Sequence, residues 1–366
     1  MVSPPFHPDD AKSTIGPAEA FVPGTEATPN IYALQHHLAL EVVAFLEDQD
    51  VPFHFRGGTA LHTKLPTRRR FSIDVDITTS EQSQVHDALK KFADRFPKSK
   101  VSLREPPAEL KVDGVRYTLD FESVTPAPLR ILVEVVEGDL GKLIAEPLRL
   151  VGDGFDWGVE VNAPTFDAFT AQKLAVLGPN TIGKPVGPDP LLARSNQGVC
   201  KQIFDLRELM GQSIDGKGVR EAYELAVAEG NALRESSHAV DDCLQDAVSF
   251  LRALRGPRLW DKSEAARYGL WSGFIESVRW IPATNRAQWT DRHFRIAGGS
   301  IARLAEAIRG GEADLAPARR PVLLQQPPEE VLAAVAAAQQ QGAAWFTPDF
   351  GGDAMIAWAW APKELW

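Results

Sequence analysis

Hydrophobic residues recur at intervals of three and four between Ile31 and Leu46, the spacing that places them on one face of a helix. The short apolar run VPFHF follows and ends close to Gly57 and Gly58, which indicates a strand, a glycine turn and a second helix. The run FSIDVDITT then alternates strictly between hydrophobic and polar residues. This period of two predicts a strand over 71–79 that packs against the protein on one side only.

Further strand and helix patterns divide the rest of the chain. A helix capped by Ser80 is expected up to about Phe96, and two strands are expected at VRYTLDFESV and RILVEVVEG. From Pro164 onward helical patterns dominate, interrupted by a loop rich in Gly and Pro at 178–190, and one long helical stretch is expected over 218–254. Eight of the nine tryptophans lie beyond residue 250, apart from the predicted strands.

The fold class expected from these patterns is α+β. It would consist of a flexible N-terminal arm at 1–29, an α/β domain with a mixed sheet at 30–155, and a mostly helical C-terminal domain at 156–366.

Composition narrows the kind of protein. A hydrophobic fraction of 44% and a charged fraction of 24% are typical of a globular protein, and no run is long enough to cross a membrane. The net charge of −10 argues against a protein that coats nucleic acid along its whole surface. Cys200 and Cys243 lack metal-site or redox spacing and are interpreted as buried thiols. Together with the lack of a secretory signal pattern, they predict a cytoplasmic location.

The first candidate site is Gly57-Gly58-Thr59, between the predicted strand and helix. Two glycines let a backbone approach a phosphate closely, and the start of the helix offers unpaired N–H groups. A Gly-Gly turn by itself is weak evidence of function.

The second candidate is the acid pair Asp74 and Asp76. On a strand, residues two apart point to the same face, so the two carboxylates repel each other unless a cation lies between them. The alternative is a solvated strand face. Because the pair follows the glycine turn closely, the sequence favours a metal site.

Glu134 lies among hydrophobic residues in the middle of a predicted strand. It is expected to be a third metal ligand, since Mg²⁺ prefers carboxylate and phosphate oxygens, or a general base for the acceptor. Asp120 competes for this role, and a plain edge-strand carboxylate is the alternative.

Lys173 lies on a largely apolar predicted helix, and Asp205 lies on a later one. Lys173 is expected to reach triphosphate oxygens, with Asp205 holding it as an ion pair or positioning the acceptor. An ordinary solvated lysine is the alternative.

Basic residues gather in the segment KLPTRRRF, which contains Lys64, Arg68, Arg69 and Arg70. On an acidic chain such a spot would provide a local entrance for RNA. A solvated loop is the alternative.

The joint pattern FRGGTAL, RFSIDVD, a lysine helix and KxxxDL resembles the nucleotidyltransferase toxins of the AbiEii type. These belong to the polymerase-beta-like nucleotidyltransferase superfamily and occur in toxin–antitoxin modules, and some members add nucleotides to the 3′ end of tRNA. The resemblance covers about residues 30–215.

The resemblance implies a role for each matched position. Gly57, Gly58 and Thr59 would form the phosphate-binding turn, and Asp74 and Asp76 would bind the metal. Arg70 and Ser72 would complete their motif, with Ser72 serving both nucleotide binding and catalysis. Glu134 would lie on the third acid strand, Lys173 would contact the nucleotide, and Asp205 would be the late helical acid.

The sequence departs from the family pattern in two places. Additional residues separate Lys173 from Asp205, and Gln202 stands where another acid is expected. Both departures concern the nucleotide pocket and the choice of acceptor.

The expected activity is therefore the Mg²⁺-dependent transfer of a nucleoside monophosphate from an NTP to RNA, with tRNA as the expected acceptor. Mn²⁺ would substitute for Mg²⁺, and a cognate antitoxin would be the protein partner. Transfer to a protein or a small molecule, or a regulator without catalysis, are the alternatives.

Overall fold

The structure is a computed structural model that describes residues 31–67, 69–96, 98–104, 114–121, 129–152, 154–255, 268–324, 326–341, 343 and 353–362. The arm expected at 1–29 lies outside the described residues, as does Arg68. The chain divides into two compact units. The first comprises Met1–Thr165 with Trp280–Asn285, and the second comprises Phe166–Arg279 with Arg286–Trp366. The division therefore falls after Thr165, whereas the sequence placed it after residue 155.

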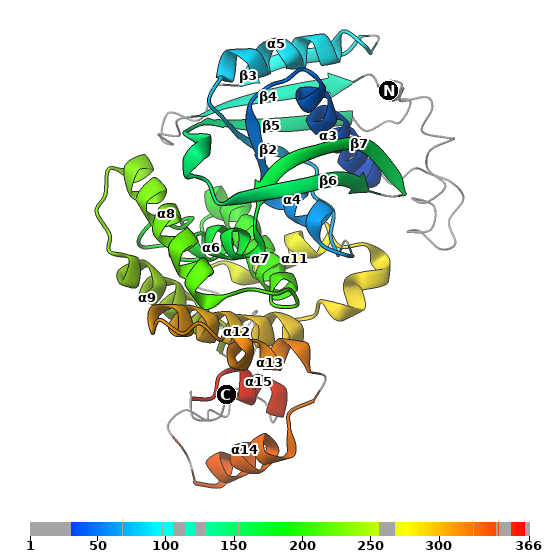
Figure 1. The fold of residues 1–366 in the computed structure, drawn as a ribbon. Helices are drawn as coiled ribbons and strands as arrows, with labels where there is room; N and C mark the ends of the chain where they lie inside the picture. The colour runs from blue at the N-terminus through cyan, green and yellow to red at the C-terminus, as the bar shows by residue number, and fades with distance from the viewer. Residues whose placement is uncertain are drawn as a thin grey trace. The chain divides into compact units, whose positions relative to one another are not determined.

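The strands of the described residues form one seven-stranded sheet, in the order β3-β4-β5-β2-β1-β7-β6 (Figure 1). Their bounds are Phe53–Arg56 (β1), Val75–Thr79 (β2), Lys100–Arg104 (β3), Gly114–Phe121 (β4), Leu129–Glu137 (β5), Ala145–Gly152 (β6) and Phe155–Pro164 (β7). The pairs β2–β5 and β1–β7 are parallel and the other pairs are antiparallel. The sheet is mixed, as predicted, and the fold is α+β.

Three strands were not identified from the sequence. β3 is a short edge strand, and β6 and β7 pair with each other at the opposite edge. Because β7 closes the first unit, it moves the boundary to Thr165.

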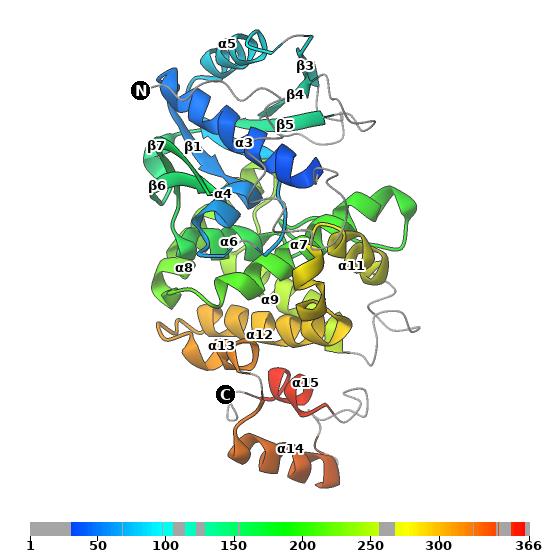
Figure 2. The same cartoon turned by 90° about the vertical axis from the view of Figure 1, so that its right-hand side faces the viewer.

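Among the described residues, the α-helices of the first unit are α3 (Ile31–Asp48), α4 (Gly57–Lys64) and α5 (Gln82–Ala93). α3 was predicted correctly (Figure 2). It packs against β2, β5, β7 and α5. Its buried Glu41 accepts a hydrogen bond from Trp157 Nε1 at 2.8 Å, which satisfies this carboxylate. α5 begins at Gln82 with Glu81 as N-cap, so the expected cap at Ser80 was wrong.

The second unit is helical. Its α-helices in the described residues are α6 (Phe166–Ala175), α7 (Ala193–Leu209), α8 (Gly216–Arg234), α9 (Val240–Leu251), α11 (Leu270–Val278), α12 (Asp291–Arg309), α13 (Ala316–Leu323), α14 (Glu329–Gln341) and α15 (Ala354–Ala359). α12 packs against α7, α9, α13 and α15. The stretch 218–254, expected to be helical, contains α8 and α9, which are separated after Glu235, a residue that adopts a left-handed conformation with φ of 52°.

Two further expectations about the chain can be compared with the structure. Cys200 and Cys243 are free and buried, as predicted. Among the described residues, none of the helices has the length and apolar character needed to span a membrane.

Candidate active site

The connection from β1 to α4 is the first part of the site. Gly57 follows β1 directly, begins α4, and has φ of +76°, a conformation that glycine adopts without strain. A Cβ atom at this position would lie 1.8 Å from Oδ2 of Asp76. The Asp76 carboxylate therefore occupies the space beside the glycine backbone. This close approach requires glycine at residue 57.

Gly58 makes a second close approach. A Cβ atom here would lie 2.6 Å from Oγ of Ser72 and 2.9 Å from Nη2 of Arg70. Arg70 is buried and also donates a hydrogen bond from Nη1 to the Phe71 carbonyl at 3.0 Å. The glycine turn thus lies against the polar side chains of the segment 70–76. The fold brings together the two halves of the sequence motif.

The position of Asp74 is fixed by a hydrogen bond to its backbone carbonyl. The Thr59 hydroxyl, in the first turn of α4, donates to the Asp74 carbonyl at 2.5 Å. β2 begins only at Val75, so Asp74 lies just before the strand, and the expected strand from residue 71 was too long. Asp74 is exposed and Asp76 is half-buried. Their placement thus rests on the turn and on Thr59 as well as on strand geometry.

Glu134 lies beside Asp76 in the sheet. The two residues are register partners in the parallel pair β2–β5, and neighbouring strands lie about 4.8 Å apart. However, Glu134 forms an ion pair with Arg116 across β4–β5, with Nε and Oε1 2.9 Å apart. Its competitor Asp120 is paired with Arg130 at 2.6 Å and is not a register partner of β2.

In the part of the chain that the structure describes, no three His, Cys, Asp or Glu side chains are grouped as a metal site, so the set of Asp74, Asp76 and Glu134 stays a prediction. Glu134 is paired with Arg116 instead. Two carboxylates still suit Mg²⁺, which is commonly bound through one or two carboxylates plus substrate phosphates. Asp74 and Asp76, with the close approach at Gly57, fit such a metal.

Residues far away in the sequence hold the motif segment in place. His36 Nδ1 lies 2.7 Å from the Ser72 carbonyl oxygen, and the Phe71 N–H donates to the Trp280 carbonyl at 2.8 Å. The ring of Trp280 also packs on Tyr32, with centroids 4.8 Å apart. Sequence reasoning missed these residues because supporting contacts between distant segments leave no local signal.

The described residues of the basic segment, Lys64, Arg69 and Arg70, are not exposed to solvent, contrary to the expectation from the sequence. Lys64 is nearly buried, forms an ion pair with Glu146, and donates to the Pro164 carbonyl at 2.8 Å. Arg70 is buried against the glycine turn and Arg69 is half-buried. Burial corrects the expectation that Arg70 contacts RNA, because a buried guanidinium is not presented to a large ligand.

Lys173 and Asp205 belong to the second unit. Lys173 on α6 and Asp205 on α7 form an ion pair with Nζ and Oδ2 3.2 Å apart. The two side chains are 9% and 0% exposed, so the solvated-lysine alternative does not hold. Asp205 therefore holds Lys173 as an ion pair, which is one of the two roles that the sequence predicted for Asp205. Its contact with a nucleotide stays a prediction.

Comparisons with known proteins indicate the family of the chain. The family model "Nucleotidyl transferase AbiEii toxin, Type IV TA system" matches residues 39–337. A solved structure, an antigenic nucleotidyltransferase-like protein from Paracoccidioides brasiliensis, is 13% identical, with 57% of this chain and 90% of that chain covered and a TM-score of 0.33. A search of curated proteins found no match. With most of its length matched by the family model, the chain belongs to the AbiEii family of nucleotidyltransferase toxins of type IV toxin–antitoxin systems.

Proposed function

We propose that this AbiEii-family nucleotidyltransferase uses Mg²⁺ to transfer a nucleoside monophosphate from an NTP to RNA, with the 3′ end of tRNA as the acceptor. The observation that carries the proposal is the contact between the Asp76 carboxylate and Gly57. It places an acid directly beside backbone that a phosphate can approach.

Asp74 and Asp76 would hold the metal, with the substrate phosphates supplying further oxygen ligands. A bound Mg²⁺ or Mn²⁺ would neutralise charge on the phosphate that is transferred. Glu134 lies beside Asp76 on the neighbouring strand and forms an ion pair with Arg116. It would serve as a third metal ligand or as the general base for the acceptor hydroxyl.

The glycine turn would bind the triphosphate. The backbone N–H groups at the start of α4 are available to phosphate oxygens, because the first N–H groups of a helix lack partners within it. The Ser72 hydroxyl lies against Gly58 and would add a donor there. Thr59 would keep Asp74 in position through its carbonyl. Most of the rate enhancement would then come from positioning.

RNA is proposed as the acceptor because of the resemblance to toxins that modify tRNA. With Lys64 nearly buried and Arg70 buried, the entrance would use Arg69, whose side chain is half-buried, and Arg68, which lies outside the described residues. The proposed protein partner is the antitoxin with which the family is paired.

One experiment tests the proposal. The protein is incubated with Mg²⁺ and each of the four labelled NTPs, together with total RNA, a mixture of proteins, or small-molecule hydroxyl compounds. Label in RNA of tRNA size that is lost in excess EDTA is the expected result. If label appears only in protein or small molecules, the result would support nucleotidyl transfer but contradict RNA as the acceptor. No label in any acceptor would favour a regulator without catalysis.

A further inference from the structure

The helical unit contains a cavity that is lined by none of the residues assigned to the transfer reaction. Its volume is about 210 Å³, and it lies between α12, α13, α15 and the last turn of α7. We call its basic lining residues the basic wall and its apolar lining residues the apolar wall.

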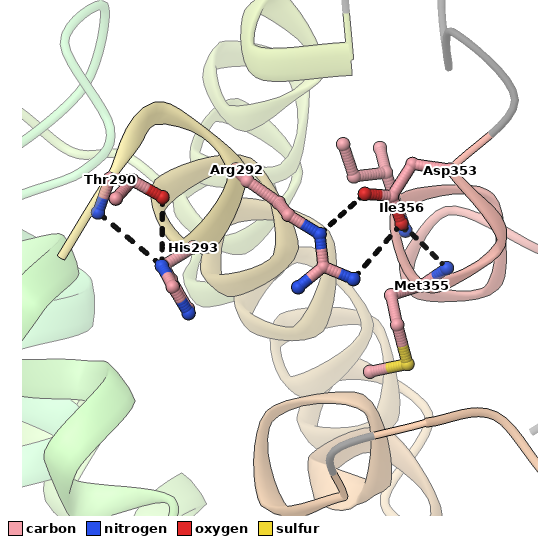
Figure 3. Close-up of polar contacts among 6 residues, drawn as sticks. All are labelled: Thr290, Arg292, His293, Asp353, Met355 and Ile356. Atoms are coloured by element: carbon pink, nitrogen blue, oxygen red, sulfur yellow. Dashed lines mark hydrogen bonds and ion pairs between the residues drawn. The ribbon is translucent and has the colours of Figure 1, made fainter. Parts of the chain in front are cut away.

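The basic wall consists of Arg207, Arg292 and His293, and none of the described residues that line the cavity is acidic. Asp353 holds the Arg292 guanidinium through two contacts of 2.5 and 3.2 Å (Figure 3). The same carboxylate caps α15 by accepting the Met355 N–H at 2.9 Å. Arg292 is therefore fixed in place before any ligand binds.

Arg207 is fixed in the same way. Its Nη1 donates to the Gln288 carbonyl at 3.0 Å, its guanidinium lies 5.5 Å from the ring centre of Trp289, and it pairs with Glu208 at 3.5 Å. Planar guanidinium groups held in this manner suit carboxylate and phosphate oxygens, because little side-chain freedom is lost on binding.

His293 reports the electrostatic character of the cavity. Its Nδ1 accepts from the Thr290 N–H at 3.4 Å and lies 2.8 Å from the Thr290 hydroxyl oxygen (Figure 3). Burial lowers its pKa, and the charges of Arg207 and Arg292 lower it further, against a smaller opposing effect of Asp353. The two arginines thus outweigh the neighbouring acid at this point.

The apolar wall consists of Ile296, Pro321, Val322, Leu323 and Met355, with Leu324 beside it. Leu323 and Leu324 are 51% and 41% exposed, although both are large hydrophobic residues. Apolar groups exposed beside fixed cations are typical of a surface that a ligand covers.

We propose that this cavity binds a small amphipathic anion, a carboxylate or phosphate monoester joined to an apolar body about the size of a benzene ring. The head group would contact Arg292 and Arg207, and the body would lie against Met355 and Val322. The volume is adequate, because a cavity of about 150 Å³ is enough to hold benzene. A carboxylate and a phosphate monoester share this chemistry, and the test distinguishes between them.

The test compares probes of one shape and different charge on the full chain. Benzoate and phenyl phosphate carry the anion and the ring, benzamide is neutral, benzylammonium is cationic, and acetate lacks the ring. Binding is followed by titration calorimetry and by chemical-shift changes of the Met355 methyl group. Benzoate or phenyl phosphate should bind at least about tenfold more tightly than benzamide, because only the anions form charge-assisted hydrogen bonds with the guanidinium groups. Whichever of the two anions binds more tightly identifies the source.

Variants place the binding in this cavity. Arg292→Gln should reduce benzoate affinity about tenfold or more, and Met355→Trp should block both benzoate and benzamide by filling the space. Arg279→Gln, which changes an exposed arginine paired with Glu276 on α11, is the matched control and should bind normally. Equal affinities for benzoate, benzamide and benzylammonium would overturn the proposal, as would the absence of saturable binding of any probe at about 10 mM.

Discussion

The Asp76 carboxylate occupies the space that a side chain on Gly57 would need, with Oδ2 only 1.8 Å from the position of a Cβ atom there. The relationship joins the glycine turn to the acid motif, although about twenty residues of sequence separate them. It also means that the smallest possible substitution at residue 57 should displace the acid.

Gly57→Ala should abolish transfer, because the methyl group would push the Asp76 carboxylate away from the turn. The matched control is Gly158→Ala. Gly158 has the same φ of +76°, but no atom lies within 4 Å of its Cβ position. Backbone strain should cost each variant about 1–2 kcal/mol of unfolding free energy, and the clash with Asp76 should add to this cost in Gly57→Ala. Only the variant at Gly57 should lose activity, measured by incorporation of labelled nucleotide. Equal activity in the two variants would contradict the placement of Asp76 in the site.

Thr59→Val should lower the transfer rate by releasing the carbonyl of Asp74. The substitution keeps the shape and removes one hydrogen bond, so the cost in stability should be about 1 kcal/mol. Thr63→Val is the control on the same helix, since its hydroxyl donates to the Thr59 carbonyl at 2.9 Å and not to the motif segment. Steady-state kinetics should show a lower kcat for the first variant and no change for the second. Reduced rates in both would assign the effect to α4 as a whole.

The acid motif illustrates what sequence can and cannot predict. The alternation around Asp76 and the Gly-Gly pair are local patterns, and the fold brings both together as expected. By contrast, the support from His36 and Trp280 depends on segments that are distant in the sequence. The partner of Glu134 was equally hidden, because Arg116 becomes its neighbour only through the register of β4 and β5.

Burial was the other quantity that local patterns did not predict. Lys64 and Arg70 look alike in a basic run, yet Lys64 pairs with Glu146 and Arg70 lies against Gly58. Both interactions depend on strands and turns from elsewhere in the chain. A basic run can therefore suggest an RNA-binding entrance in a segment where the fold buries some of the charges.

The ion pair of Lys173 and Asp205 allows stability to be separated from activity. Asp205→Ala should cost about 3–5 kcal/mol of unfolding free energy, because the Lys173 ammonium stays buried without this carboxylate. Lys217→Ala, at an exposed pair with Glu221 on α8, should cost less than about 0.5 kcal/mol. Denaturant unfolding measures both values, and a cost below about 1 kcal/mol for Asp205→Ala would show that the pair is not buried in solution.

Replacing both partners, Lys173→Met with Asp205→Leu, should restore most of that stability, because apolar residues of similar volume often replace a buried pair without loss. Transfer should nevertheless remain absent if Lys173 contacts the nucleotide. A stable double variant with normal kinetics would reduce Lys173 to a structural residue.

Stability should also depend on the protonation of His293. Its pKa is lowered in the folded protein, chiefly by burial and then by Arg207 and Arg292, so the unfolded chain binds more protons as the pH falls below about 6.5, the ordinary pKa of histidine. The contribution of His293 is therefore present above that pH and is lost as the pH decreases. His293→Gln keeps an acceptor for the Thr290 N–H but does not titrate. Thermal unfolding between about pH 5 and pH 7 should show a flatter pH dependence in this variant, and an identical slope would contradict the assignment.

The metal-dependent transfer of a nucleotide is proposed to depend on Asp74 and Asp76. It is tested most directly by measuring incorporation of labelled nucleotide into RNA by the wild type, Asp74→Asn, Asp76→Asn and Asp120→Asn, with circular dichroism as the check on folding. Asp120 is a carboxylate of the same sheet that pairs with Arg130, so it controls for the loss of a charge. The two motif variants should fold normally and lose about 10³-fold or more in rate, while Asp120→Asn should stay near the wild type. Turnover near the wild-type rate in either motif variant would contradict the account.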